Sequence, residues 1–588
     1  MSAVVRVTRG LVVATSLLLA ACESEPVADL ILTNAAVYTL SWAEPDSEGN
    51  PAADAPFTSG VWTPDAEAVA LKDGLILAVG SSADVDAFRG SDTEVIDVAG
   101  ATVIPGLVES HGHFEELGEL AEEVDLVGVR TMDEMIERVM ARAESTPEGE
   151  WIVGGGWDEG EWANRLPTNT RLNSLLPNTP VVLKGLRGFG VLGNAAALQP
   201  AGINRETPAA SGGEIVKDAD GEPTGVLLNR AVPMLRGAIP ERSLEQRKRI
   251  ILHGLNTILE AGYVAGHHAG VYSDYMSAYM ALAEEGALPI RVEVMPATRE
   301  PNRAVVEEWI ERGPTENPRN RLQVRSVKAY YDASLGSRGA KMIGGYADMP
   351  NEMGLAGAEY GFLEDLVTRC IAAGFQAGIH AIGDGGNRDV LDFYERTFAE
   401  FPQAGELRHR IEHAQIVHPD DFRRFSELNL VASMEPAHAV EDAPWAEDRV
   451  GPERILGAYA WRTMRRNGVA LLFNSDLSGT DFDIFYGLHS AITRTDKRLE
   501  PAGGWYPDQT MTPEEALRGY TVWAAYASSR EGLTGTIDPG KWADLTVLSI
   551  DPLNVGTTDP HALLNGEVLM TIIEGEIAFS RVVRREDG

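Results

Sequence analysis

Eight short apolar runs follow one another along the chain, and helix-compatible segments separate several of them. Alternation of strand-like and helix-like segments is typical of an α/β barrel with a parallel sheet. In order, the runs are TVIPGLVES, AGYVAGHHA, IRVEVMP, RSVKAYYDAS, FQAGIHAIGD, RHRIEHAQI, LVASMEPAH and VALLFNSD. The sequence therefore predicts an α/β protein whose barrel occupies residues 107–530.

The two ends of the chain are rich in short strand-like runs with glycine at their turns. ADLILTNAAVYTL and AVALKDGLILAVG stand near the start, and GTIDPGKWADLTVLSID and VLMTIIEGEIAFSRVV near the end. We expect both ends to form one small β-sandwich from residues 29–106 and 531–588. Residues from about 146 to 240 lack the alternation of strand-like and helix-like segments seen in the rest of the middle region. We therefore expect an inserted subdomain there, after the first barrel strand.

The first 22 residues read as an export signal. Arg6 and Arg9 precede the apolar run LVVATSLLLAA, which ends in small residues directly before Cys22. A basic start, a short apolar run and a small-residue cleavage site are typical of a secretory signal, and the run is too short to prefer spanning a membrane. LAAC resembles a bacterial lipobox, in which the cysteine is lipidated.

This leader predicts a signal peptide at residues 1–21 and a lipidated linker at 22–28. The expected product is a bacterial cell-envelope lipoprotein, on the periplasmic side or the cell surface, that meets the membrane only through its lipid. A generic signal peptide with a chance cysteine is the alternative. The net charge of −38 argues against a nucleic-acid partner, which requires clustered lysine and arginine. We expect a small-molecule substrate.

Ionisable residues lie at or near the ends of several of the apolar runs. Catalytic side chains of α/β barrels occupy the carboxyl ends of the strands. Two histidines two positions apart on a strand point to the same side, so they can hold one ion. The later residues are spaced as barrel units of about 30 residues require, and they fit strands 4, 5, 6 and 8. The candidate set is His111, His113, Lys328, His380, His413 and Asp476.

Neutral imidazoles and carboxylates suit Zn²⁺ and similar divalent ions, and a catalytic site keeps one position open for water. A bound metal lowers the pKa of that water to near 7. Asp476 could take the proton and pass it to a leaving group. Alternatively, Asp476 caps a helix in NSDLSG. Lys328 could instead pair with a carboxylate, because lysine ligates a metal only when it is neutral or carboxylated.

A set of ordered motifs resembles the amidohydrolase superfamily, in its YtcJ-like amidohydrolase 3 branch. They are IPGLVESHGHF, GGGWDEGEW, VKAYYDASLGSRGA, IHAIGDGGN, RIEHAQI, SMEPAHA, NSDLSG, MTPEEAL and GTIDPGKWADLTVLSID. The resemblance covers about residues 29–580 and implies a distorted (β/α)8 TIM barrel capped by a β-sandwich from both termini. It further implies that His111, His113 and Asp476 hold one ion and that His380 and His413 hold a second. Lys328, carboxylated in many relatives, would bridge the two.

The resemblance implies a metal-dependent hydrolase of a carbon–nitrogen bond other than a peptide bond. Metal-bound hydroxide would attack an amide, N-acyl or cyclic amide carbonyl, with zinc as the expected metal and one or two ions per site. The alternatives are an ester or lactone hydrolase at the same site, or an inactive lipoprotein that binds a ligand. Phe189, NSD and DAS depart from the usual pattern of the branch, and they leave the substrate open.

Four further residues are candidates for the substrate pocket. Trp157 and Asp158 follow three glycines, as a binding loop would, although the tryptophan could equally anchor the insert. His268 ends a strand and either lines the pocket or packs. Arg338 either clamps a substrate carboxylate or forms a salt bridge within its loop. His438 is grouped with the structural histidines.

Overall fold

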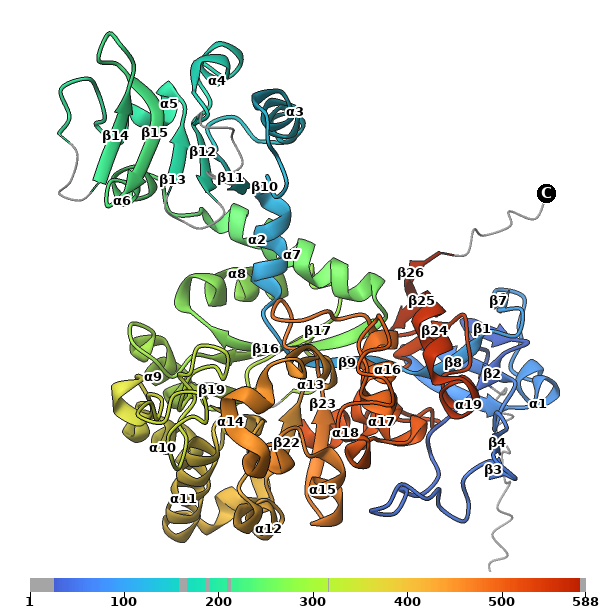
Figure 1. Cartoon of the computed structure of the whole chain (residues 1–588). Helices are drawn as coiled ribbons and strands as arrows, with labels where there is room; N and C mark the ends of the chain where they lie inside the picture. The colour runs from blue at the N-terminus through green and yellow to red at the C-terminus, as the bar shows by residue number, and fades with distance from the viewer. Residues whose placement is uncertain (1–25, 158–165, 186–189, 209–212, 316, 582–588) are drawn as a thin grey trace, which may run out of the picture.

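The computed structural model describes residues 26–157, 166–185, 190–208, 213–315 and 317–581. Figure 1 shows a large body with a smaller one standing apart from it. The predicted signal peptide and its lipidation site Cys22 lie outside the described residues. Within the described part of the chain, no helix has the length and apolar character that crossing a membrane requires.

The large body is a parallel α/β barrel, as the sequence predicts. Each of the eight apolar runs contains a strand among the described residues, and each strand is buried over most of its length. The barrel strands are β9 (Leu107–Gly112), β16 (Tyr263–Val271), β17 (Arg291–Pro296), β19 (Ser326–Tyr330), β20 (Gln376–Ala381), β21 (Arg410–His413), β22 (Val431–Met434) and β23 (Ala470–Phe473).

The barrel is distorted because its strands form two sheets instead of one closed cylinder. One sheet has the order β18-β17-β16-β9, with the short β18 (Leu322–Gln323) at its edge, and the other runs from β19 to β23. Single parallel bridges, from Ala297 to Lys328 and from Gly112 to Leu477, cross the two seams. The second bridge joins the end of the first strand to the segment that follows the last.

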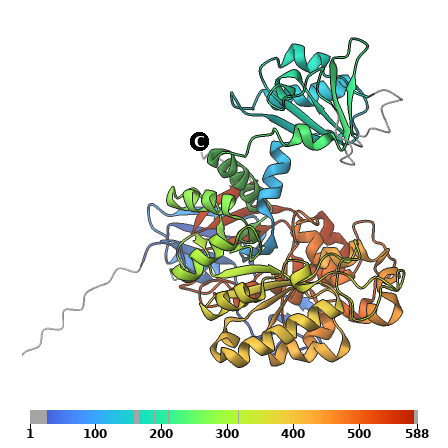
Figure 2. The same ribbon diagram turned by 90° about the vertical axis from the view of Figure 1, so that its left-hand side faces the viewer.

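Helices cover the outer side of the strands and extend over the rim of the barrel (Figure 2). Their apolar faces belong to the same continuous core as the strands. They are α8 (Ser273–Glu284), α9 (Arg303–Arg312), α10 (Glu364–Ala372), α11 (Asp384–Glu400), α12 (Phe422–Glu427), α13 (Pro436–Asp442), α14 (Ala446–Arg454), α15 (Trp461–Arg466), α16 (Ile484–Thr493), α17 (Pro513–Gly519) and α18 (Val522–Ala527).

Both ends of the chain form two sheets that share an apolar core beside the barrel. One sheet has the order β6-β5-β1-β7 and the other β2-β8-β24-β25-β26. Leu32, Val69 and Val547, from opposite ends of the chain, pack in this core. The strands are β1 (Leu30–Thr33), β2 (Ala36–Val37), β5 (Ala68–Lys72), β6 (Leu75–Gly80), β7 (Glu94–Asp97), β8 (Thr102–Pro105), β24 (Leu545–Leu548), β25 (Val568–Ile573) and β26 (Glu576–Ser580).

The smaller body is an insertion between the first and second barrel strands (Figure 1). The insertion runs from Val124 to Arg236. It therefore begins before residue 146, the start that the sequence pattern predicts. Its sheet has the order β10-β11-β12-β13-β15-β14. The elements are β10 (Val124–Asp125), β11 (Ile152–Trp157), β12 (Val181–Gly185), β13 (Gly190–Gly193), β14 (Gly213–Lys217), β15 (Pro223–Asn229), α3 (Met132–Ala143), α4 (Thr170–Leu175), α5 (Ala195–Leu198) and α6 (Val232–Arg236).

Two helices connect the insert to the barrel, α2 (Phe114–Glu122) on the way out and α7 (Leu244–Glu260) on the way back. They pack against each other at glycines. A Cβ at Gly254 would lie 2.0 Å from the carbonyl oxygen of Phe114, and one at Gly118 would lie 1.9 Å from that of Ile250. Because those contacts are with backbone atoms, the two helices can approach this closely only when both positions lack a side chain.

Candidate metal centre

The predicted ligands lie in barrel strands or directly after them, most of them at the carboxyl ends. Five different strands contribute, so chain folding gathers residues that are hundreds of positions apart. His111 is in β9 and His113 follows it, Lys328 is in β19, His380 in β20, His413 ends β21, and Asp476 follows β23.

His111, His113 and Asp476 form one compact group. Their ligand atoms lie within 4.8 Å of one another. Asp476 Oδ1 is 3.5 Å from His111 Nε2 and 3.4 Å from His113 Nε2. The backbone N–H of His113 donates a 2.6 Å hydrogen bond to the carbonyl of Leu477. The junction of the first and last strands therefore sets the spacing of these ligands.

A second group shares Asp476 with the first. His413, His438 and Asp476 also place their ligand atoms within 4.8 Å of one another. His438, which the sequence assigns to the structural histidines, lies instead at the centre, near the start of α13. Its Nε2 is 3.9 Å from Asp476 Oδ2.

Two buried glutamates orient the histidines from behind. Glu412 Oε2 is 2.7 Å from His111 Nδ1, and Glu435 Oε2 is 3.1 Å from His413 Nδ1. A carboxylate on Nδ1 fixes the tautomer and leaves Nε2 free to bind a metal. Neither glutamate is predicted from the sequence, although each stands in one of the motifs, RIEH or SMEP.

Glu109 joins the first strand to the loop that carries Asp476. Its carboxylate accepts hydrogen bonds from the backbone N–H and the hydroxyl of Ser475, at 3.1 and 2.7 Å. It also accepts from the backbone N–H of His111 at 3.3 Å. Burial raises the pKa of Glu109 to about 8, with the hydrogen bonds from Ser475 and His111 opposing the rise.

The charges at the centre suit a cation. Burial, with help from Lys328, lowers the pKa of His111 to about 4, so its imidazole is neutral at pH 7, as metal binding requires. Burial opposes ionisation of Asp476, but the hydrogen bond from His113 and the neighbouring histidines outweigh it and hold its pKa well below the usual range. A neutral imidazole beside a partly exposed carboxylate is a typical donor set for a divalent metal.

Lys328 and His380 lie beside these groups. Lys328 Nζ is 2.8 Å from His111 Nε2, and burial lowers the pKa of its amine. The His380 ring is 4.5 Å from that of His413, measured between centroids. His380 Nε2 is buried without a hydrogen-bond partner among the described residues and lies 3.6 Å from Asp332 Oδ1. An unpartnered buried nitrogen here is consistent with a centre made for a metal.

Two of the central residues have an unusual backbone. The φ angle is +73° at His413 and +51° at Asp476, in the left-handed region that non-glycine residues rarely adopt. Such conformations cost about 1–3 kcal/mol each and gather at functional sites. Between the paired histidines, a Cβ at Gly112 would lie 2.9 Å from both Leu477 and Phe114 side chains, so no larger residue fits without a shift.

The four pocket candidates lie in different surroundings. Trp157 is 0% exposed in the core of the insert, and its indole N–H donates to the carbonyl of Leu183 at 2.9 Å. Arg338 is paired with Asp348 at 2.8 Å. Asp158 lies outside the described residues.

His268 lies near the centre. Its ring is 6.4 Å from that of His113, between centroids. The side chain is fully buried, with Nδ1 2.7 Å from the Tyr279 hydroxyl and Nε2 paired with Glu115. Both nitrogens are therefore occupied by neighbouring side chains.

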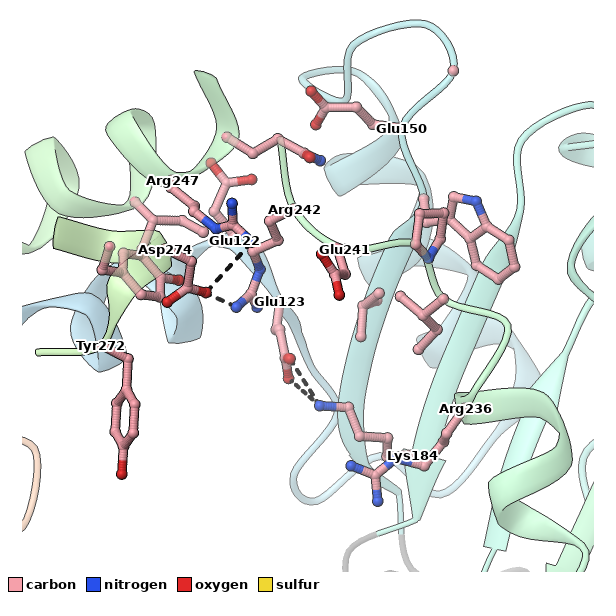
Figure 3. A pocket seen from close by; sticks show the side chains of 18 of the residues that line it. Glu122, Glu123, Glu150, Lys184, Arg236, Glu241, Arg242, Arg247, Tyr272 and Asp274 are labelled. Atoms are coloured by element: carbon pink, nitrogen blue, oxygen red, sulfur yellow. Dashed lines mark hydrogen bonds and ion pairs between the residues drawn. The ribbon is translucent and has the colours of Figure 1, made fainter. Parts of the chain in front are cut away.

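A cavity of about 780 Å³ lies apart from the metal centre, between the insert and the barrel helices. Figure 3 shows its charged walls, where Lys184 of β12 reaches Glu123 at the end of α2. Their nearest atoms are 2.8 Å apart. The cavity is lined by residues of the insert and of the two helices that connect the insert to the barrel.

Residues 94–579 match the model of the amidohydrolase family. The chain belongs to this family. The amidohydrolase is 30% identical to the putative amidohydrolase YtcJ of Bacillus subtilis over 522 residues, which are 88% of this chain and 96% of that protein. It is 27% identical to the N-substituted formamide deformylase of Arthrobacter pascens over 533 residues, 88% of this chain and 95% of that protein.

A solved structure shares the architecture of the amidohydrolase. It is an uncharacterized metal-dependent hydrolase from Pyrococcus horikoshii, with a TM-score of 0.68 and 26% identity over 90% of this chain and 99% of that one. Family membership confirms the predicted fold class. It also makes the protein a hydrolase that acts on carbon–nitrogen bonds other than peptide bonds.

Proposed function

We propose that this amidohydrolase uses a divalent metal to cleave an amide, N-acyl, N-formyl or cyclic amide bond of a small molecule. The observation that carries the proposal is the position of Asp476, whose carboxylate faces histidines from both ligand groups. The name of the deformylase relative supports the inclusion of N-formyl compounds. The acidic chain favours a small molecule over a nucleic acid.

The residues at the centre divide the work of hydrolysis. His111, His113 and Asp476 would hold the metal, which supplies the Lewis acidity that polarises a carbonyl group and lets water ionise near neutral pH. Asp476 accepts a proton from the attacking water and returns it to the departing nitrogen. Glu412 keeps His111 Nε2 directed at the centre throughout.

Zinc is the metal we propose, because it favours nitrogen and oxygen ligands of this kind. Lys328 would join the ligands as a carbamate, formed when its amine adds carbon dioxide and releases a proton. Burial lowers the pKa of Lys328, which favours the neutral amine that this addition needs.

We also propose that the protein is exported and anchored by a lipid on Cys22, from the lipobox-like LAAC sequence. Mass spectrometry of the mature amino terminus, from protein made in a bacterial host, tests this. A lipid-modified Cys22 is the expected result. An unmodified Cys22, or a mature chain that begins elsewhere, would contradict the anchor.

A substrate screen with paired compounds tests the proposed reaction. Purified protein of measured metal content is assayed on N-acyl, N-formyl and cyclic amides, each beside the ester or lactone of the same shape. We expect turnover of at least one amide class, with a higher kcat/KM than its oxygen counterpart. Turnover confined to esters or lactones would contradict the amide assignment, and metal-loaded protein without any turnover would favour a ligand-binding role.

A further inference from the structure

We infer that Arg299 binds a carboxylate of the substrate. The amide cleaved at the metal centre then carries this carboxylate on its departing amine, as an N-acyl or N-formyl amino acid does. The inference rests on the proposed amide hydrolysis and names a substrate class for the same site. Arg338, the arginine that the sequence suggests for such a contact, is paired with Asp348 instead.

Backbone contacts fix Arg299 beside the metal centre. β17 ends at Pro296, and the segment after it continues along β19 through the bridge from Ala297 to Lys328. The backbone N–H and the hydroxyl of Thr298 both donate to the carbonyl of Lys328, at 2.8 and 2.9 Å. Arg299 is the next residue, so it lies at the end of the barrel where catalytic side chains gather.

The ring of Tyr330 lies against both Arg299 and residues of the metal centre. Tyr330 is two residues after Lys328 in β19, so the two side chains point to the same side of the strand. Its ring centroid is 5.3 Å from Lys328 Nζ and 6.1 Å from the centroid of the His380 ring. Arg299 Cζ is 4.8 Å from the same Tyr330 centroid. Arg299 is therefore one aromatic ring away from the metal centre.

The guanidinium of Arg299 is held in place, yet it has no carboxylate partner among the described residues. The ring of Tyr360 lies 4.6 Å from Cζ, and Nη2 donates to the Tyr360 carbonyl. The adjacent acid, Glu300, pairs with Arg303 at 3.0 Å. Nη1 donates to no described residue and is not enclosed, so this side of the guanidinium can accept a ligand.

A carboxylate is the ligand that this arrangement suits. The arginine fork binds a carboxylate through two parallel, charge-assisted hydrogen bonds. Two tyrosine rings restrain the guanidinium of Arg299, so binding sacrifices little side-chain freedom. In an N-acyl amino acid, only the amide nitrogen and the α-carbon separate the carboxylate from the scissile carbonyl carbon. This short span is consistent with a guanidinium one ring away from the metal centre.

The cavity beside the insert leaves room for the rest of such a substrate. Its barrel end is lined by Tyr272, which directly follows β16, and by Pro301, two residues after Arg299. Figure 3 shows Tyr272 at that end, apart from the pair of Lys184 and Glu123. The side chain of the amino acid would extend into this space while its carboxylate pairs with Arg299.

Paired substrates and matched variants test the inference. N-formyl derivatives of alanine, leucine and phenylalanine, in both enantiomers, are each assayed beside the carboxamide that replaces the carboxylate. The proteins are the parent, Arg299→Met, Arg299→Lys and the control Arg312→Met. Arg312 also lies over an aromatic ring, 5.2 Å from the centroid of Trp309, but it is exposed at the end of α9. Metal content and the thermal unfolding midpoint are measured for every protein.

We expect the parent to cleave at least one carboxylate with a kcat/KM about tenfold or more above that of its carboxamide, because hydrogen bonds to charged groups are the stronger ones. Arg299→Met is expected to lose this preference, since its kcat/KM falls far more for the carboxylates than for the carboxamides, mainly through KM. Arg299→Lys should keep part of the preference, and Arg312→Met should match the parent.

Equal losses on both members of a pair, in folded and metal-loaded Arg299→Met, would show a structural role for Arg299 and overturn the inference. A carboxylate preference that survives in Arg299→Met would overturn it as well, and so would a parent without that preference. In these cases the parent still cleaves amides, so the proposed function stands. A metal-loaded parent that cleaves no amide contradicts the proposed function along with the inference.

Discussion

Replacing Asp476 with Asn is expected to lower kcat by about 10²- to 10⁴-fold, the range that general acid–base groups contribute. Asn keeps the shape and one oxygen of the side chain but cannot accept the proton from water at neutral pH. His111 and His113 remain, so we expect metal content to stay largely intact. The measurement is kcat on the best amide from the screen, with metal analysis of the same samples.

Asp481→Asn is the matched control for this variant. Asp481 is five residues further along, and its carboxylate pairs with Lys497 at the surface instead of facing the ligand groups. We expect kcat of this control to remain close to that of the parent. An Asp476→Asn protein with full metal content and undiminished kcat would show that Asp476 is not the proton acceptor.

Replacing Gly254 with Ala is expected to lower the free energy of unfolding by about 1–3 kcal/mol, as overpacking does. The new methyl group would begin 2.0 Å from the carbonyl oxygen of Phe114, so α2 and α7 must separate. Because α2 starts directly after His113, we also expect weaker metal binding. Urea unfolding and metal titration measure the two effects.

Gly532→Ala provides the comparison. Gly532 is exposed, and a Cβ there would meet nothing within 4 Å among the described residues. We expect its unfolding midpoint and metal affinity to match the parent. If Gly254→Ala unfolded at the parent's urea concentration, the close helix contact would not stabilise the protein. If Gly254→Ala lost stability but bound metal normally, the packing of α2 against α7 would not affect the position of His113.

The strands, and the polar side chains at or near their ends, could be predicted because each leaves a local pattern in the sequence. A buried parallel strand reads as an apolar run, and a polar side chain at its end stands out. The candidate ligands His111, Lys328 and Asp476 are predicted in this way. Their convergence follows from the barrel, which brings every strand end to the same rim.

The residues that orient the histidines have no comparable pattern in the sequence. Glu412 and Glu435 each stand within a predicted strand run, yet whether a glutamate points toward a neighbouring histidine depends on packing between strands. His438 is the last residue of the predicted run LVASMEPAH, but the strand ends at Met434 and His438 lies in the short helix that follows. The insert begins before its predicted start because α3, an amphipathic helix with a capping box at Thr131 and Glu134, resembles the barrel helices in sequence.

The paired helices α2 and α7 have a consequence for how this family can diversify. The chain leaves the barrel just after one ligand-bearing strand and returns just before the next strand, through two helices that lie side by side (Figure 1). Everything between them, Val124 to Arg236, is bounded by two adjacent crossing points. Recombination could exchange that segment for another of different size while leaving every proposed ligand in place. The insert could therefore change independently of the barrel.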